Sequence, residues 1–215
     1  METVTTTRAR RPARRGRPPE AERAARRDAL LATAQRLFLR LGFGRTTIDA
    51  VAAEAHVAKR TIYDTVGDKT DLFVAVVRRL SDEVLAALPA PDSPTGRDDL
   101  REFSRTLLGA LLTDEAVGMK RLMIAEAGHF PEIAERLYDN GPRRYIEMLR
   151  ALLPPCLPDA TDTELDATAE DLFAGLLGEP HRRRLFGVAP APTPEQIATQ
   201  VDRVLPRFLP AEPGA

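Results

Sequence analysis

Tryptophan is absent from this 215-residue sequence, and aromatic residues together make up only 5% of it. Leucine, alanine and valine must therefore supply most of any hydrophobic core. No uninterrupted apolar run approaches the roughly 18 residues that a membrane span needs, so no transmembrane segment is expected. The arginine-rich N-terminus has no apolar segment behind it, and a secretory signal is not predicted either.

Cysteine and histidine are also scarce. The one cysteine, Cys156, excludes an internal disulfide and fits a reducing, cytoplasmic compartment, with a structural thiol favoured over a redox sensor. The histidines (His56, His129 and His181) lie far apart in sequence and show no metal-ligand spacing. Glycine-rich phosphate loops and nucleophile elbows are missing too. The sequence thus predicts a protein that is not an enzyme and holds no metal or cofactor.

The formal net charge of −1 conceals an asymmetry along the chain. Residues 1–80 hold 17 Lys and Arg against 9 Asp and Glu, whereas residues 81–215 hold 14 against 23. A basic N-terminal third joined to an acidic remainder indicates that only the front of the chain meets a polyanion. Hydrophobic residues at 43% and charged residues at 29% are typical of a globular protein.

Apolar residues recur at helical spacings of three and four, and no stretch alternates for long enough to predict a strand. The expected fold is therefore all-α. The predicted divisions are a disordered basic arm at 1–19, a helix–turn–helix domain at 20–66, a connecting helix at 67–88 and a helical domain at 89–215. Further helices are expected near 97–113, 115–128, 131–153, 163–178 and 194–209, with a break at 140–142 and a capping box at Thr161 and Glu164.

The stretch "TTIDAVAAEAHVAKRTIYDTVGD" predicts two short helices around a tight turn at 56–57, which is the arrangement of a helix–turn–helix. Thr46 and Asp49 have the spacing of a capping box for the first helix, and Asp68 can cap the long helix that follows. The second helix is expected to bury its aliphatic residues and expose its basic and hydroxyl ones. Two interpretations of the exposed face stay open: a solvated polar surface, or a recognition helix for the major groove.

The longer segment "LFLRLGFGRTTIDAVAAEAHVAKRTIYDTVGDKTDLF" resembles the DNA-binding domain of the TetR family of bacterial transcriptional regulators. The matching positions are Phe38, Gly42, Phe43, Thr46, Thr47, Ile48, Ala52, Val57, Thr61, Tyr63, Lys69 and Leu72. The resemblance implies phosphate contacts by Arg45, Thr47, Tyr63 and Lys69, and base contacts by Lys59, Arg60 and Thr61.

Three departures from the family pattern affect this segment. His56 stands where the turn usually has glycine, and histidine tolerates a left-handed backbone better than most residues do. Ala58 stands where a serine usually caps the recognition helix, at an expected cost of about 1 kcal/mol. Thr65 and Val66 replace a frequent aromatic or His-Phe pair, which removes one potential phosphate ligand.

The basic arm contains Arg15-Gly16-Arg17-Pro18, which is similar to the core of an AT-hook. In that arrangement the glycine lets the backbone lie on the floor of a narrow minor groove while Arg15 and Arg17 extend along it. Loose contact with phosphates is the alternative. With either interaction, the protein is expected to bind DNA more tightly, and with greater sensitivity to salt, than the globular domain alone would.

The resemblance also implies partners: a pseudo-palindromic double-stranded DNA operator, a second copy of the chain and a small-molecule effector of unknown identity. Repression is the predicted mode, with activation and effector-independent binding as alternatives. A helical interaction protein with a basic tail and no sequence-specific DNA recognition is the competing hypothesis.

The C-terminal helices provide candidates for the implied effector and dimer sites. The effector candidates, for each of which a plain core position is the alternative, are Phe103, Leu107, Met119, Met123, Phe130 and Phe173. The candidates for a dimeric four-helix bundle are Leu172, Phe173, Leu176, Leu177, Val201, Val204, Leu205 and Phe208. His129 is expected to cap a helix or to line the pocket, and the arginines of "HRRRLFG" are expected to form a solvated rim.

Overall fold

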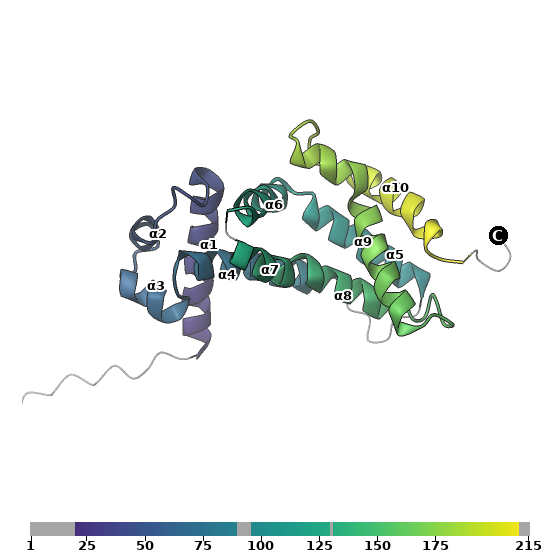
Figure 1. Cartoon of the computed structure of the whole chain (residues 1–215), viewed down its shortest axis with the longest axis horizontal. Coiled ribbons are helices and arrows are strands. Elements are labelled where there is room, and N and C mark those ends of the chain that lie inside the picture. Colours follow the sequence, from purple (N-terminus) through teal and green to yellow (C-terminus); the bar gives the residue numbers. More distant parts are fainter. Residues whose placement is uncertain (1–19, 90–95, 130, 211–215) are drawn as a thin grey trace, which may run out of the picture.

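The computed structural model describes residues 20–89, 96–129 and 131–210, and these residues form helices and loops without a strand (Figure 1). The all-α prediction is confirmed. The elements are α1 (Glu20–Leu41), α2 (Ile48–Glu54), α3 (Lys59–Thr65), α4 (Lys69–Ala87), α5 (Arg97–Leu111), α6 (Asp114–Ala127), α7 (Pro131–Asn140), α8 (Pro142–Leu152), α9 (Asp162–Leu185), α10 (Pro194–Val204) and the 3₁₀ turn η1 (Leu205–Arg207). Within the described ranges, no helix is both long and apolar enough to cross a membrane.

Helices α1 to α4 enclose a core centred on three phenylalanines. The ring centroid of Phe38 in α1 lies 5.8 Å from that of Phe43 and 5.1 Å from that of Phe73 in α4, the second pair meeting edge to face. Phe38 and Phe73 are fully buried, as is Ile62, the residue that attaches α3 to the rest of the domain. Burial of these large side chains holds the two short helices, which would be marginal alone, against α1.

A second core joins α5, α8, α9 and α10 at the opposite end of the elongated molecule from α2 and α3 (Figure 1). The two cores are not separated by a linker. Met119 of α6 and the α7 residues Ile133 and Leu137 are buried in the core of the N-terminal helices. The DNA-binding segment predicted from sequence is thus packed directly onto two helices of the C-terminal region.

Several helix boundaries follow the predicted local signals. Asp68 and Asp71 form a reciprocal capping box at α4, and Thr161 and Glu164 form one at α9. The chain breaks at Gly141, as expected. The predicted capping box at Thr46 is wrong: the N-cap of α2 is Thr47, whose hydroxyl accepts from Ala50 N.

Thr46 is buried instead, and its hydroxyl lies 2.8 Å from Gly42 O, to which it donates. The shift by one residue has a simple cause: only one of the two adjacent threonines can face the helix end, and the other closes the turn after α1.

The predicted helix end at residue 178 coincides with a kink, which separates two helical segments within α9. Gly178 has φ 41° and ψ −142°, and Pro180 follows inside the helix. Proline has no N–H to give to the carbonyl four residues earlier. The buried Gln200 of α10 makes up for this, because its Nε2 donates to Gly175 O at 3.0 Å and to Leu176 O at 3.1 Å.

Most of the apolar residues proposed for a dimer bundle are buried by their own chain. Exposure is 3% or less for Leu172, Leu176, Val201, Val204 and Leu205. These five side chains pack between α9, α10 and the rest of the second core, so they do not face a partner. Phe173, Leu177 and Phe208 are partly buried beside them.

Candidate nucleic-acid interface and internal cavity

The turn between α2 and α3 has the tight geometry that the sequence predicts. His56 has φ 53°, in the left-handed region where the family pattern has glycine. Val57 N donates to Ala52 O at 3.0 Å, which closes the turn. Helix α3 then projects from the domain with Ile62 buried on its inner side.

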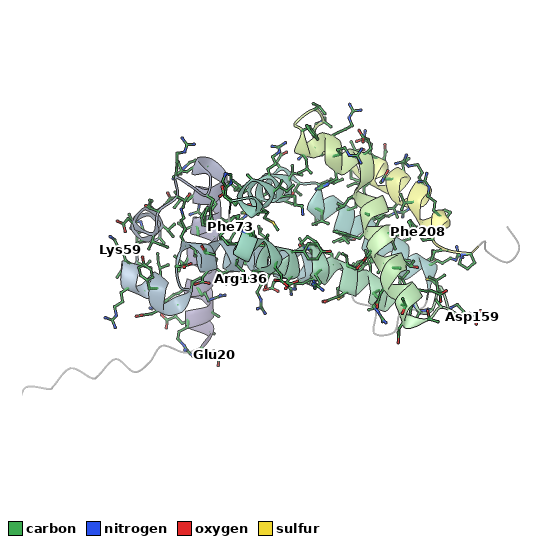
Figure 2. The ribbon with its side chains drawn as sticks, viewed as in Figure 1. Glu20, Lys59, Phe73, Arg136, Asp159 and Phe208 are labelled. Atoms are coloured by element: carbon green, nitrogen blue, oxygen red, sulfur yellow. The ribbon has the colours of Figure 1, made fainter. Side chains whose placement is uncertain are left out.

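The outer face of α3 is polar and exposed. Tyr63 is 55% exposed, and Arg60, Thr61 and Lys59 (labelled in Figure 2) are exposed as well. Lys59 Nζ lies 2.6 Å from Asp49 Oδ1 in α2, and Arg60 Nε lies 3.4 Å from Asp64 Oδ2. Surface ion pairs of this kind are worth about 1 kcal/mol or less, so a polyanion can displace the carboxylates.

The start of α3 lacks a side-chain cap. Ala58 occupies the N-cap position with an extended backbone (φ −71°, ψ 144°) and no side-chain hydrogen bond. We expect Ala58→Ser to raise the free energy of unfolding by about 1 kcal/mol, because serine can accept from a free N–H of the first turn. Urea denaturation followed by circular dichroism measures this, with Ala58→Gly, expected to give a smaller gain, as the matched control. An unchanged or lowered stability of Ala58→Ser would contradict the prediction.

Three further candidate contact residues flank α3 and already have bonds within the domain. Lys69 Nζ donates to Phe43 O at 3.1 Å and lies 4.3 Å from the centroid of the Phe43 ring. Arg45 Nε donates to Leu41 O at 2.9 Å, and Thr47 caps α2. The sequence indicated none of these internal roles for Lys69 and Arg45, since each depends on a carbonyl brought close by the turn after α1.

A cavity of about 600 Å³ lies between α4, α5, α6, α7, α8 and α9. Its wall is mainly apolar and includes Val77, Leu80, Met119, Met123, Phe173 and Leu177. Both its volume and its lining fall within the usual range for small-molecule sites. A smaller hollow of about 150 Å³ shares Lys120, Met123 and Tyr138 with it and adds the exposed Ile124.

Polar groups occur at a few points of the wall. Burial lowers the pKa of the Lys120 ammonium, and burial followed by the nearby charge of Lys120 lowers the pKa of His181. Burial also raises the pKa of Tyr145. Helix α6 therefore places a partly dehydrated cation beside an imidazole from the second half of α9, within an otherwise apolar lining.

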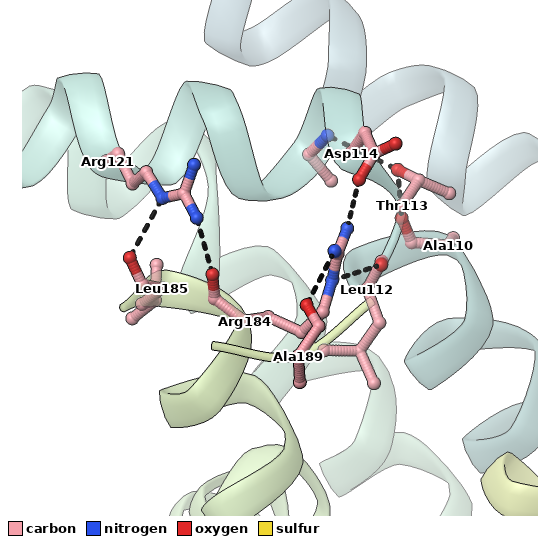
Figure 3. Close-up of polar contacts among 9 residues, drawn as sticks. Ala110, Leu112, Thr113, Asp114, Arg121, Arg184, Leu185 and Ala189 are labelled. Carbon is pink, nitrogen blue, oxygen red and sulfur yellow. Dashed lines mark hydrogen bonds and ion pairs between the residues drawn. The ribbon is translucent and has the colours of Figure 1, made fainter. Parts of the chain in front are cut away.

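The second half of α9 is fixed to α6 by two arginines (Figure 3). Arg121 donates to the carbonyls of Arg184 and Leu185 at the end of α9. Arg184 is 6% exposed and donates to Asp114 Oδ1 at 2.6 Å and to Leu112 O at 3.2 Å. The expected solvated rim is thus wrong for Arg184, which is buried because it satisfies the turn before α6.

Comparison with known proteins now bears on this geometry. A family model described as the C-terminal domain of AefR-like transcriptional repressors matches residues 98–211, which is more than half of the chain. A second model, for bacterial regulatory proteins of the tetR family, matches residues 30–76. The chain belongs to the TetR family of transcriptional regulators.

Relatives support this assignment across most of the TetR-family chain. An uncharacterised helix–turn–helix transcriptional regulator of Mycobacterium tuberculosis is 30% identical over 187 residues, covering 84% of this chain and 86% of the relative. The repressor BepR of Brucella suis is 29% identical over 102 residues, covering 46% of this chain and 49% of the relative.

Solved structures agree in fold. A regulator from Mesorhizobium loti assigned to the TetR family superposes with a TM-score of 0.69 at 23% identity, covering 86% of this chain and 96% of that one. The flavonoid-responsive regulator FrrA superposes with a TM-score of 0.66 at 26% identity, covering 86% and 95%.

The candidate site residues of this TetR-family protein divide into three groups. Met119, Met123 and Phe173 line the cavity, whereas Phe103 and Leu107 do not: both are 1% exposed and pack in the second core. Arg15, Arg17 and Phe130 lie outside the described residues. His129 does not line the cavity either; its Nδ1 lies 2.9 Å from Ala125 O at the end of α6.

Proposed function

We propose that the protein is a homodimeric repressor whose two α3 helices enter successive major grooves of a pseudo-palindromic operator. The observation that carries the proposal is the exposed face of α3, where Lys59, Arg60, Thr61 and Tyr63 surround the buried Ile62. Lysine, arginine and threonine are suited to base edges, and Tyr63 to a phosphate. Arg45, Thr47 and Lys69 supply further phosphate contacts, and Arg15 and Arg17 supply minor-groove or phosphate contacts.

A small-molecule effector occupies the cavity in this proposal. Support comes from its volume, its apolar lining and its position between α4 and α9. FrrA, a relative in structure, is described as flavonoid-responsive, and both the C-terminal family model and BepR are described as repressors. Repression relieved by an effector is therefore the mode we assign.

The dimer forms through α9 and α10 in this proposal, by their outward faces rather than by the side chains buried in the second core. These helices lie at the end of the molecule remote from α3 (Figure 1). Phe186 and Val188, just after α9, are large apolar residues that are 79% and 64% exposed in the single chain. Analytical ultracentrifugation should therefore find a dimer.

Contacts between the helices that line the cavity and the DNA-binding helices support a mechanical link. Arg136 of α7 donates to Asp71 in the first turn of α4 at 2.8 Å, and this bond lowers the pKa of Asp71. A Cβ built on Gly118 of α6 would lie 2.9 Å from Leu39 Cδ2 in α1, so the two helices are in direct contact. An effector shifts α3 only if it binds one arrangement of these helices more tightly than the other.

Footprinting on the DNA that flanks the protein's own gene tests the proposal. A protected palindrome, bound at least about 10³-fold more tightly than random DNA, is expected. Equal affinity for random DNA would instead favour a helical interaction protein with a basic tail.

The phosphate contact assigned to Arg45 gives a quantitative prediction. Arg45→Ala should weaken operator binding and random-DNA binding alike, and the slope of log affinity against log salt should fall by about one. Arg207→Ala is the matched control, since Arg207 is an exposed arginine next to Phe208, which lies at the opposite end of the molecule from Lys59 (Figure 2). Fluorescence anisotropy at several salt concentrations measures both slopes, and an equal change in the two variants would contradict the assignment.

A further inference from the structure

Lys120 is unusual among the basic residues of the cavity region. It lines both the large cavity and the smaller hollow beside it. The described part of the chain offers its ammonium neither a hydrogen bond nor an ion pair, although burial has already removed part of its water and lowered its pKa. A partly desolvated cation is stabilised by a nearby negative charge, and a bound anionic ligand would supply one here.

The other charges around the cavity do not neutralise Lys120. Glu83 of α4 pairs with Arg79 at 2.5 Å, and Glu115 accepts a hydrogen bond from Gln35 of α1. Both carboxylates, like Glu170 of α9, belong to exposed residues, so water screens their charge.

Two neighbours of Lys120 define what it can bind. His181, with a lowered pKa, is a neutral imidazole at neutral pH and can donate one hydrogen bond. The guanidinium of Arg121, next along α6, is already bound to the carbonyls of Arg184 and Leu185. One free positive charge and one neutral donor match a single negative charge, not a dianion such as a phosphate monoester.

We propose that the effector is an apolar organic acid whose carboxylate pairs with Lys120 and accepts from His181, while its hydrocarbon or aromatic body fills the cavity. This inference rests on the proposed effector site and adds its chemistry. The body contacts Met119, Met123, Phe173 and Leu177, whose flexible or aromatic side chains adapt to varied shapes. A charge-assisted bond formed away from water is stronger than a neutral one.

Isothermal titration of the full-length protein without DNA tests the charge preference. Three probes share one aromatic body: 2-naphthoate, 2-naphthalenemethanol and 2-naphthylmethylammonium. At neutral pH we expect 2-naphthoate to bind at least about tenfold more tightly than the alcohol, and the ammonium to bind most weakly. Equal binding of acid and alcohol, preference for the ammonium, or no binding of any probe would each overturn the proposal.

Variants of Lys120 separate charge recognition from structure. Lys120→Met keeps the length and apolar stem of the side chain, so the alcohol should bind as before while the preference for 2-naphthoate falls to within about twofold. Lys120→Arg should keep the preference, and so should the control Glu102→Gln, at an exposed position of α5 outside the cavity wall. A preference that survives Lys120→Met would overturn the role of Lys120. Footprinting on the operator is carried out without effector. Absence of a protected palindrome would therefore count against the proposed function and not against the charge preference of the cavity.

Discussion

Phe38→Ala should lower the free energy of unfolding of the DNA-binding helices by about 3–5 kcal/mol, because it removes a fully buried ring and leaves a cavity. Phe38 touches both other rings of the cluster, at centroid distances of 5.8 Å to Phe43 and 5.1 Å to Phe73. Those rings join α1, the following turn and α4. Loss of the central ring therefore weakens the packing of the core in which Ile62 of α3 is buried. Operator affinity should fall together with stability.

Urea denaturation followed by far-ultraviolet circular dichroism measures the loss, since the chain has no tryptophan for fluorescence. Phe38→Leu, which leaves a smaller gap, should cost clearly less than Phe38→Ala. Arg27→Ala truncates an exposed side chain of the same helix and should change stability by no more than about 0.5 kcal/mol. A loss below about 1 kcal/mol for Phe38→Ala would contradict the central role of the cluster.

Gln200→Leu should lower the free energy of unfolding by about 2–4 kcal/mol, because one buried and one partly buried carbonyl lose their side-chain donor. These are Leu176 O, whose helical donor would be the N–H that Pro180 lacks, and Gly175 O one residue before it. Leucine has nearly the same volume, so the loss reflects unsatisfied polar groups rather than a cavity. The side-chain amide oxygen of Gln200 also accepts from Arg203, and that bond is lost as well.

The neighbouring Thr199→Ala is the control for Gln200→Leu, since Thr199 is exposed and bonds only within its own helix. The same denaturation measurement applies. If Gln200→Leu proved as stable as the parent protein, the kink would have to be held by other contacts.

The sequence predicted the fold wherever the decisive interaction is local. The caps at Asp68 and Thr161, and the break at Gly141, involve atoms a few residues apart. The break at Gly178 is local too, but the helical segment after it was not expected, because the Gln200 amide that bonds to the carbonyls before the kink comes from α10.

For the candidate sites, too, the sequence predicted the features that depend on local spacing and missed those that depend on tertiary contacts. The exposed face of α3 followed from the helical spacing of Val57, Ile62 and Val66, of which Ile62 is fully buried and the other two are partly buried. The size and apolarity of a side chain do not tell whether it lines a cavity or packs in a core. Both Phe103 and Phe173 were therefore candidates, but only Phe173 lines the cavity. Lys120 and His181 were missed because they are 61 residues apart in a sequence that gives no sign of their proximity.

Val77 and Met119 belong both to the core of the N-terminal helices and to the wall of the cavity. Evolution of a new effector specificity is therefore constrained unevenly across the wall. Substitutions at Val77 or Met119 would alter the affinity of the effector-free protein for DNA as well as its specificity for the effector. Phe173, Ala174 and Leu177 of α9 lie outside that core, so substitutions there would change effector specificity alone. Paralogues that diverge in inducer while keeping their operators should differ first at those α9 positions.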